Sequence, residues 1–127
     1  MAAHGIFIVH PNWWGMPPAI LKGWIDHVLR MEAAYRFVAN DQGGVPVGLL
    51  QATAAIVFNM ANTPEAHDQK GLCDPLERLW KKCVFNLFGD INVHRRTFAV
   101  VVASASQQRA RWLAEMWECV ARCFPPE

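Results

Sequence analysis

The chain has 127 residues, the length of one domain, and 53% of them are hydrophobic while 18% are charged. This composition excludes an intrinsically disordered chain, because such chains are poor in apolar residues. The formal net charge of +1 gives no electrostatic basis for binding nucleic acid or an anionic membrane surface. No apolar stretch approaches the roughly 20 residues that cross a bilayer, and the first residues do not form a secretory signal, so we expect a cytoplasmic protein without membrane insertion.

The first expected elements are a strand, a loop rich in aromatic residues and a helix. Residues 6–9 form a continuous apolar run, which predicts a strand buried on both faces, as in a parallel sheet. The loop at 10–16 carries two adjacent tryptophans, Trp13 and Trp14. A helix over 18–31 follows, with one wide apolar stripe made of Ile20, Leu21, Trp24, Ile25, Val28 and Leu29.

The middle of the chain predicts an irregular segment and then a second strand. Residues 34–48 are expected to be irregular, because 41–44 is the strongest turn signal in the chain and a proline and a glycine follow it. The apolar run at 53–58 predicts a second buried strand. A loop at 59–64 is expected to end that strand.

The next helix has a well-marked beginning. Asp74 is the expected N-cap, Pro75 the first helical residue, and Glu77 is placed to complete a capping box. Gly89 is expected to end the helix. The apolar side chains at helical spacing are Leu76, Leu79, Trp80, Cys83, Val84 and Leu87.

The last expected elements are a third buried strand over 97–103 and a helix over 106–124 with Ser106 as its cap. This helix carries two apolar stripes. One stripe is expected to cover the sheet, and the other needs a partner in this chain or in another subunit. The stripes are Ala110, Leu113, Trp117, Val120 and Phe124, and Trp112, Met116, Cys119 and Cys123.

The cysteines and the paired basic residues predict no metal or redox site. No two cysteines are spaced as CxxC, so we interpret Cys73, Cys83, Cys119 and Cys123 as free thiols with apolar neighbours. The basic pairs at 81–82 and 95–96 are interpreted as solvated helix and loop positions.

The expected order β-α-β-α-β-α predicts an α/β fold with a parallel sheet and right-handed crossovers. The tryptophan loop then lies at the carboxyl end of a strand, where ligands bind in open α/β sheets. A flat, apolar surface on that loop suits a flat ligand.

The same loop and the helix after it resemble the flavodoxin-fold NAD(P)H dehydrogenases, the quinone-reductase family. The resemblance rests on an aromatic loop after a strand and on the helix start that follows it. These residues are Pro11-Asn12-Trp13-Trp14-Gly15-Met16-Pro17-Pro18-Ala19-Ile20-Leu21-Lys22-Gly23-Trp24-Ile25-Asp26. The resemblance implies a flavodoxin-like, three-layer α/β/α domain over residues 1–127.

The resemblance also implies an activity. Family members hold FMN or FAD and pass electrons from NADH or NADPH to a quinone or a similar small acceptor. They are commonly homodimers whose active site lies at the subunit interface. The resemblance places the flavin ring against two loops of this chain, made of Pro11, Asn12, Trp13, Trp14 and Gly15, and of Asn59, Met60, Ala61 and Asn62.

Two further residues are expected at the acceptor or nicotinamide site, Tyr35 by the resemblance and His67 by its position near the second loop. The Tyr–His pair of some family members has no counterpart here, and Leu72 stands where the histidine would fall. No catalytic residue is therefore assigned.

The resemblance begins at what would be the family's third strand, so we expect a domain that is truncated at its amino end relative to the family. The strand at 6–9 should then lie at an edge of the sheet, with apolar surface open to a partner. The segment that holds the flavin phosphate at a helix N-terminus has no counterpart in the sequence. Two alternatives therefore stay open: a non-catalytic interaction module, like the ancillary subunits of potassium-efflux transporters, and an inactive fragment.

Overall fold

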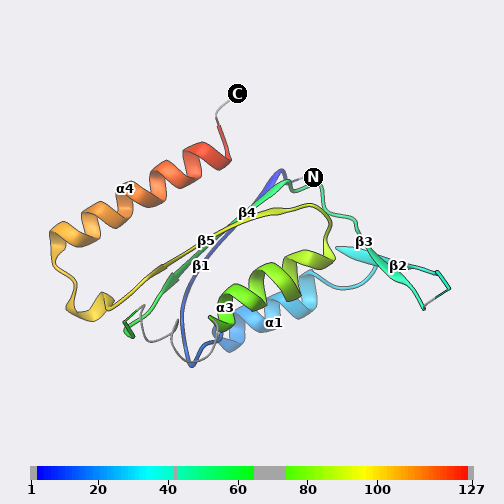
Figure 1. Cartoon of the computed structure of the whole chain (residues 1–127), viewed down its shortest axis with the longest axis horizontal. Coiled ribbons are helices and arrows are strands. Elements are labelled where there is room, and N and C mark those ends of the chain that lie inside the picture. The colour runs from blue at the N-terminus through cyan, green and yellow to red at the C-terminus, as the bar shows by residue number, and fades with distance from the viewer. Residues whose placement is uncertain (1–2, 42, 65–73, 126–127) are drawn as a thin grey trace.

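The computed structural model describes residues 3–41, 43–64 and 74–125, and its centre is a parallel sheet (Figure 1). The sheet has three strands in the order β1 (Gly5–Pro11), β4 (Ala54–Met60) and β5 (Asn92–Phe98). Their register aligns the last residues of the three strands, Pro11, Met60 and Phe98, at one edge. The loops that follow these strands therefore meet there. The expected α/β fold with a parallel sheet is confirmed.

One face of the sheet is covered by two helical segments. They are α1 (Ala19–Val28), and α3 (Pro75–Glu77) with its continuation as a π-helix, η1 (Arg78–Val84), and a 3₁₀ turn, η2 (Phe85–Leu87). The core between these helices and the sheet consists of large apolar side chains from every element. Its most buried members are Val57, Leu76, Trp80 and Phe85.

Among the described residues, the opposite face carries the helix α4 (Ser106–Cys123), which Figure 1 shows apart from the other helices across the sheet. Ile56, Phe58 and Phe98 are buried on this face. The stripe of α4 that packs on them includes Trp112, Met116, Cys119 and Cys123. The layers are therefore helix, sheet and helix, as expected for a flavodoxin-like fold.

β1 lies at an edge of the sheet, as expected, because it pairs only with β4 within the described sheet. The expectation that both its faces are buried is wrong. Ile8 is buried among the helices of the covered face, but Phe7 is 51% exposed and Val9 is 46% exposed on the face toward α4. The buried residues beneath α4 belong to β4 and β5, and the Phe124 ring that follows α4 lies against Gly5 at the start of β1.

The segment expected to be irregular forms a two-stranded antiparallel ribbon, β2 (Tyr35–Val38) and β3 (Val45–Gly48). Aromatic and β-branched residues supply the strands, and the turn signal at 41–44 joins them. Gly48 fits only without a side chain, because a Cβ there would lie 1.8 Å from the Phe88 carbonyl oxygen. The ribbon therefore packs against the end of η2, outside the main sheet.

The third strand lies earlier than expected, at Asn92–Phe98 instead of 97–103. The apolar residues after Phe98 leave the sheet: Val100 has a positive φ of 53°, and Val101–Ala103 form a 3₁₀ turn, η3. The expectation that Arg95 and Arg96 lie on a solvated loop or helix is also wrong. Both lie within β5, where carboxylates on neighbouring helices pair with them.

Several helix details correct the sequence analysis. Helix α1 is shorter than residues 18–31, and Ile20 on its stripe is 86% exposed. Ser106 does not cap α4; the N-cap is Ala105, which has no capping side chain. Cys83 is exposed instead of packed on the core, since the π-helical turn of η1 changes the spacing of the buried positions.

None of the helices in the described ranges has the length and hydropathy that a bilayer crossing requires.

The N-cap of α3 is confirmed, because Asp74 Oδ1 accepts hydrogen bonds from the Leu76 and Glu77 amides, both at 3.1 Å. In the expected capping box, the Glu77 side chain would accept a hydrogen bond from the N-cap backbone. The Glu77 carboxylate instead pairs with Arg95 Nε at 3.0 Å and with Lys81 Nζ at 2.6 Å. The start of this helix is therefore tied to β5.

Candidate functional site

The tryptophan loop forms a tight hairpin at the carboxyl edge of the sheet. Trp13 and Met16 exchange two backbone hydrogen bonds of 3.0 Å each, with Trp14 and Gly15 between them. Both central residues have positive φ, 57° and 75°, the requirement of a type I′ turn. A positive φ is strained for a tryptophan, and strain of this kind is concentrated at functional sites.

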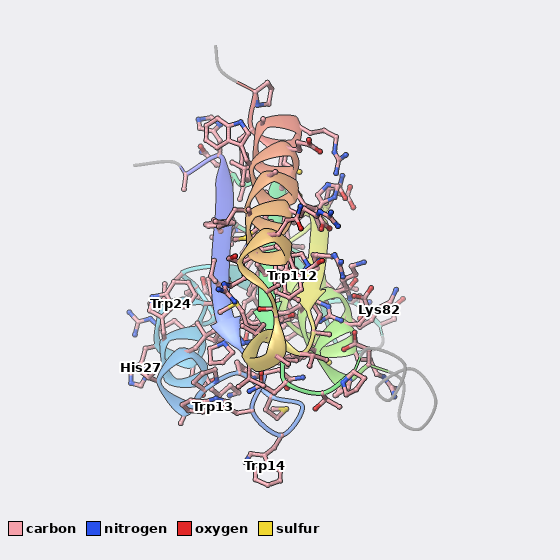
Figure 2. The ribbon with its side chains drawn as sticks, turned by 90° about the vertical axis from the view of Figure 1, so that its left-hand side faces the viewer. Trp13, Trp14, Trp24, His27, Lys82 and Trp112 are labelled. Atoms are coloured by element: carbon pink, nitrogen blue, oxygen red, sulfur yellow. The ribbon has the colours of Figure 1, made fainter. Side chains whose placement is uncertain are left out.

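The two indole rings of this hairpin face solvent. Trp14 is fully exposed and Trp13 is 59% exposed. Figure 2 shows Trp14 projecting from the tip of the loop, with Trp13 closer to α1. None of the described residues covers the Trp14 ring, so the hairpin presents an aromatic surface to a ligand or to another chain.

The backbone of the hairpin offers fewer donors than the sequence analysis expected. The Asn12 amide donates to the Met60 carbonyl at 2.7 Å, and the Gly15 amide donates to Asn12 Oδ1 at 2.9 Å. The Trp13 and Met16 amides bond each other's carbonyl groups. Within residues 12–16, the Trp14 amide is thus the N–H without a hydrogen bond to any described residue.

The second expected loop is divided between the sheet and the surface. Asn59 and Met60 belong to β4 instead of a loop, and the Asn59 side chain is fully buried and bonded within the fold. Ala61 is also buried and is bonded through its amide to the Phe98 carbonyl at 2.9 Å. Asn62 is exposed, and its Oδ1 accepts a hydrogen bond from the Val102 amide at 3.0 Å. Met60 and Asn62 therefore remain as candidate contacts from this loop.

A buried polar network, which we call the His10 network (His10, Asn59, Trp80 and Arg95), lies under the site. His10 Nδ1 lies 2.8 Å from the Pro11 carbonyl oxygen, while His10 Nε2 lies 2.6 Å from Asn59 Nδ2 and 3.1 Å from Trp80 Nε1. Two N–H donors converge on Nε2, so Nδ1 must carry the proton in this hydrogen-bonding pattern. Asn59 Oδ1 in turn accepts from Arg95 at 2.7 Å.

The electrostatics of the His10 network favour a neutral imidazole. Burial lowers the pKa of His10 below its ordinary value of 6.5, and the Arg95 charge adds to this, against the hydrogen bond to Pro11. The Arg95 side chain is only 5% exposed and is paired with Asp74 and Glu77. The sequence analysis missed this network. Arg95 stands among polar residues at 94–97, so no apolar run marked it as part of a strand.

Of the two other expected site residues, Tyr35 is described, and it is separated from the hairpin. Tyr35 begins β2 and packs on Phe37 and Phe88, with ring centroids 5.8 and 5.9 Å apart. Phe88 precedes β5, so Tyr35 lies near the amino end of the sheet, away from the tryptophan hairpin. His67 lies outside the described residues, as do Leu72 and Cys73.

Metal and disulfide chemistry find no support in the part of the chain that the structure describes. No group of three metal-ligating side chains is present among those residues. Cys83, Cys119 and Cys123 are free. Burial, followed by the neighbouring Cys123, raises the pKa of the Cys119 thiol, which makes it a weaker nucleophile at neutral pH.

Comparison with known proteins decides the family. Residues 1–119 match the family described as flavodoxin-like fold. The chain belongs to this flavodoxin-like family. The flavodoxin-like resemblance inferred from the tryptophan loop is thereby confirmed, and a curated relative is named NAD(P)H oxidoreductase.

The curated relative is an uncharacterized NAD(P)H oxidoreductase of Haemophilus influenzae, 29% identical over 126 residues that cover 89% of this chain and 60% of the relative. Two solved structures have similar folds. The Smu.1420 protein of Streptococcus mutans UA159 superposes with a TM-score of 0.77 at 23% identity, covering 94% of this chain and 61% of that one. A putative quinone reductase of Klebsiella pneumoniae gives 0.76 at 21%, covering 98% and 51%. This flavodoxin-like chain thus spans between half and two thirds of the length of these relatives.

Proposed function

We propose that the chain forms the ring-binding part of a flavin-dependent NAD(P)H oxidoreductase that reduces a quinone or a similar small acceptor. The observation that carries the proposal is the Trp13–Trp14 pair, exposed on a strained turn at the carboxyl edge of a parallel sheet. Flavodoxin-like membership and relatives named NAD(P)H oxidoreductase and quinone reductase support it.

The residues present fit the ring of a flavin in part. Two exposed indoles supply flat apolar surface, and the unbonded Trp14 amide and the exposed Asn62 side chain supply polar contacts near it. FMN or FAD, when bound, supplies the two-electron redox chemistry between NADH or NADPH and the acceptor. The role of the chain is then to stack on the ring, to orient it and to keep water from one face.

Flavin binding tests the proposal directly. The purified chain is titrated with FMN and then with FAD, and the visible absorbance and the retained flavin after gel filtration are measured. We expect saturable uptake, which Trp14→Ala weakens about tenfold by removing one stacking surface. The matched control is Trp117→Ala, which removes an exposed tryptophan on α4, on another part of the surface, and should leave uptake unchanged.

The electron donor and the acceptor are tested on the loaded protein. Anaerobic NADH and NADPH should bleach the flavin band, and a quinone should restore it. No uptake of either flavin at high concentration, with the chain folded, would overturn the proposal. Equal loss of binding in the Trp14→Ala and Trp117→Ala variants would remove the hairpin from it.

A second candidate function, a non-catalytic interaction module, is favoured by a separate observation. Leu113 and Trp117, which belong to one of the two apolar stripes expected on α4, are 65% and 74% exposed. A partner chain would cover this apolar surface. Sedimentation equilibrium, with and without flavin, separates a cytoplasmic dimeric enzyme from a module that associates without binding flavin.

A further inference from the structure

The His10 network reaches the tryptophan hairpin through the last residue of β1. His10 Nδ1 donates to the Pro11 carbonyl oxygen at 2.8 Å. The next residue, Asn12, bonds the sheet through its amide and accepts the Gly15 amide on its side chain at 2.9 Å. A continuous path of hydrogen bonds and backbone therefore leads from the buried imidazole to the turn.

A second path leads from the same network to the same turn. The Arg95 guanidinium pairs with the Asp74 carboxylate at the N-cap of α3. Pro75 follows Asp74, and it lies so close to the hairpin that a Cβ on Gly15 would be 2.8 Å from its Cγ atom. Arg95 therefore supports the hairpin from two sides, through Asn59 and His10 and through the start of α3.

The hairpin needs this support, because its own side chains provide little. Trp14 is fully exposed and Trp13 is 59% exposed, so neither indole is fixed by the core. The turn requires a positive φ at Trp14, and this φ is strained for a tryptophan. Short hairpins are also only marginally stable in water without further packing. The direction of the aromatic surface thus depends on the backbone contacts beneath it.

We propose that Arg95 and His10 are positioning residues, which hold the Trp13–Met16 hairpin in the orientation that a flat aromatic ligand requires. The identity of the ligand rests on the function proposed above, whereas the positioning of the hairpin does not. Asn59 joins the two residues, since its amide donates to His10 and its carbonyl accepts from Arg95.

Hydrogen exchange of the Trp13 and Met16 amides tests the positioning. Arg95→Met keeps an unbranched apolar stem but removes the guanidinium bonds to Asn59 and Asp74, and we expect these two amides to exchange about tenfold faster. The matched control is Arg96→Met, on the opposite face of β5, which loses its pair with Glu115 on α4 and should not change them. Arg95→Lys should restore part of the protection. Unchanged exchange in a folded Arg95→Met variant overturns the proposal.

A measurement on the unmodified chain covers the case in which Arg95→Met does not fold. The ¹⁵N shifts of the His10 ring should show the neutral imidazole with the proton on Nδ1. The charged groups around it are Arg95 on β5 and, paired with Arg95, Asp74 and Glu77 on α3. As the pH is lowered, the Trp13 and Met16 amide shifts should follow the His10 ring. A proton on Nε2, or a ring that titrates without the amides, overturns the proposal.

FMN binding then separates this proposal from the proposed function. If the unmodified chain binds FMN, Arg95→Met should weaken binding about tenfold while Arg96→Met leaves it unchanged. Faster exchange of the Trp13 and Met16 amides together with an unchanged FMN affinity would overturn the role of Arg95 in ligand binding. If the unmodified chain binds no flavin, the proposed function fails, and the amide measurements still decide whether Arg95 and His10 hold the hairpin.

Discussion

The two faces of the sheet are covered to very different extents. On the face of α1 and α3, side chains such as Val57, Leu76 and Trp80 are almost fully buried. On the face of α4, burial is confined to β4 and β5, and Phe7 and Val9 on β1 remain half exposed. Both α1 and α3 belong to connections between successive strands of the sheet, and these connections cover the first face. On the second face, α4 is the one helix among the described residues, and it leaves part of β1 open.

The largest expected difference between the faces is in stability. Trp80→Ala, on the covered face, removes a fully buried ring and a donor to His10, and should cost about 3–5 kcal/mol of unfolding free energy. Trp117→Ala, on the exposed side of α4, should change it by less than about 0.5 kcal/mol. Urea denaturation followed by circular dichroism measures both. Similar losses in the two variants would mean that α4 is covered in solution.

A smaller effect is expected from pH, and it arises on the covered face. Because burial lowers the pKa of His10 in the folded chain, the unfolded chain binds more protons below the ordinary pKa of 6.5. The contribution of His10 to stability is therefore complete above that pH and declines as the pH falls below it. Urea midpoints at a series of pH values measure the decline, and His10→Gln should reduce it. A variant with an unchanged pH dependence would exclude His10 as its source.

The smallest expected effect is a gain in stability at the solvent side of α1. Gly23 lies inside the helix, and a Cβ there would meet no atom within 4 Å. Gly23→Ala should therefore stabilise the chain by about 0.5–1 kcal/mol through helix propensity. Thermal unfolding measures the gain. A loss of stability would show that this side of α1 is covered in solution, which would extend the contrast between exposed and covered surfaces to a second helix.

The parts of the fold that were predictable are those with local causes. The Asp74 cap, the apolar run of β4 and the aromatic loop after β1 each carry their own signal. The position of β5 did not follow from the sequence, because Arg95 and Arg96 enter the strand only where Asp74, Glu77 and Glu115 neutralise them across the fold. Pairings over such distances leave no periodic pattern.

The candidate site divides in the same way. Trp13 and Trp14 were recognised from their place in the sequence, and the structure presents both to solvent. Asn59 was expected on a loop, but the strand continues through it and its amide is used inside the fold. His10 was not among the expected site residues, and its hydrogen bonds came to light only once Trp80 and Asn59 were placed beside it.

The full exposure of Trp14 has an optical consequence. An indole in water emits fluorescence at longer wavelengths than one enclosed in a core, such as Trp80, and small soluble quenchers reach it freely. A chromophore stacked on Trp14 would accept its excitation energy and dim the red side of the emission. The fluorescence of Trp14 would therefore report the binding of a chromophore at the hairpin without any attached label.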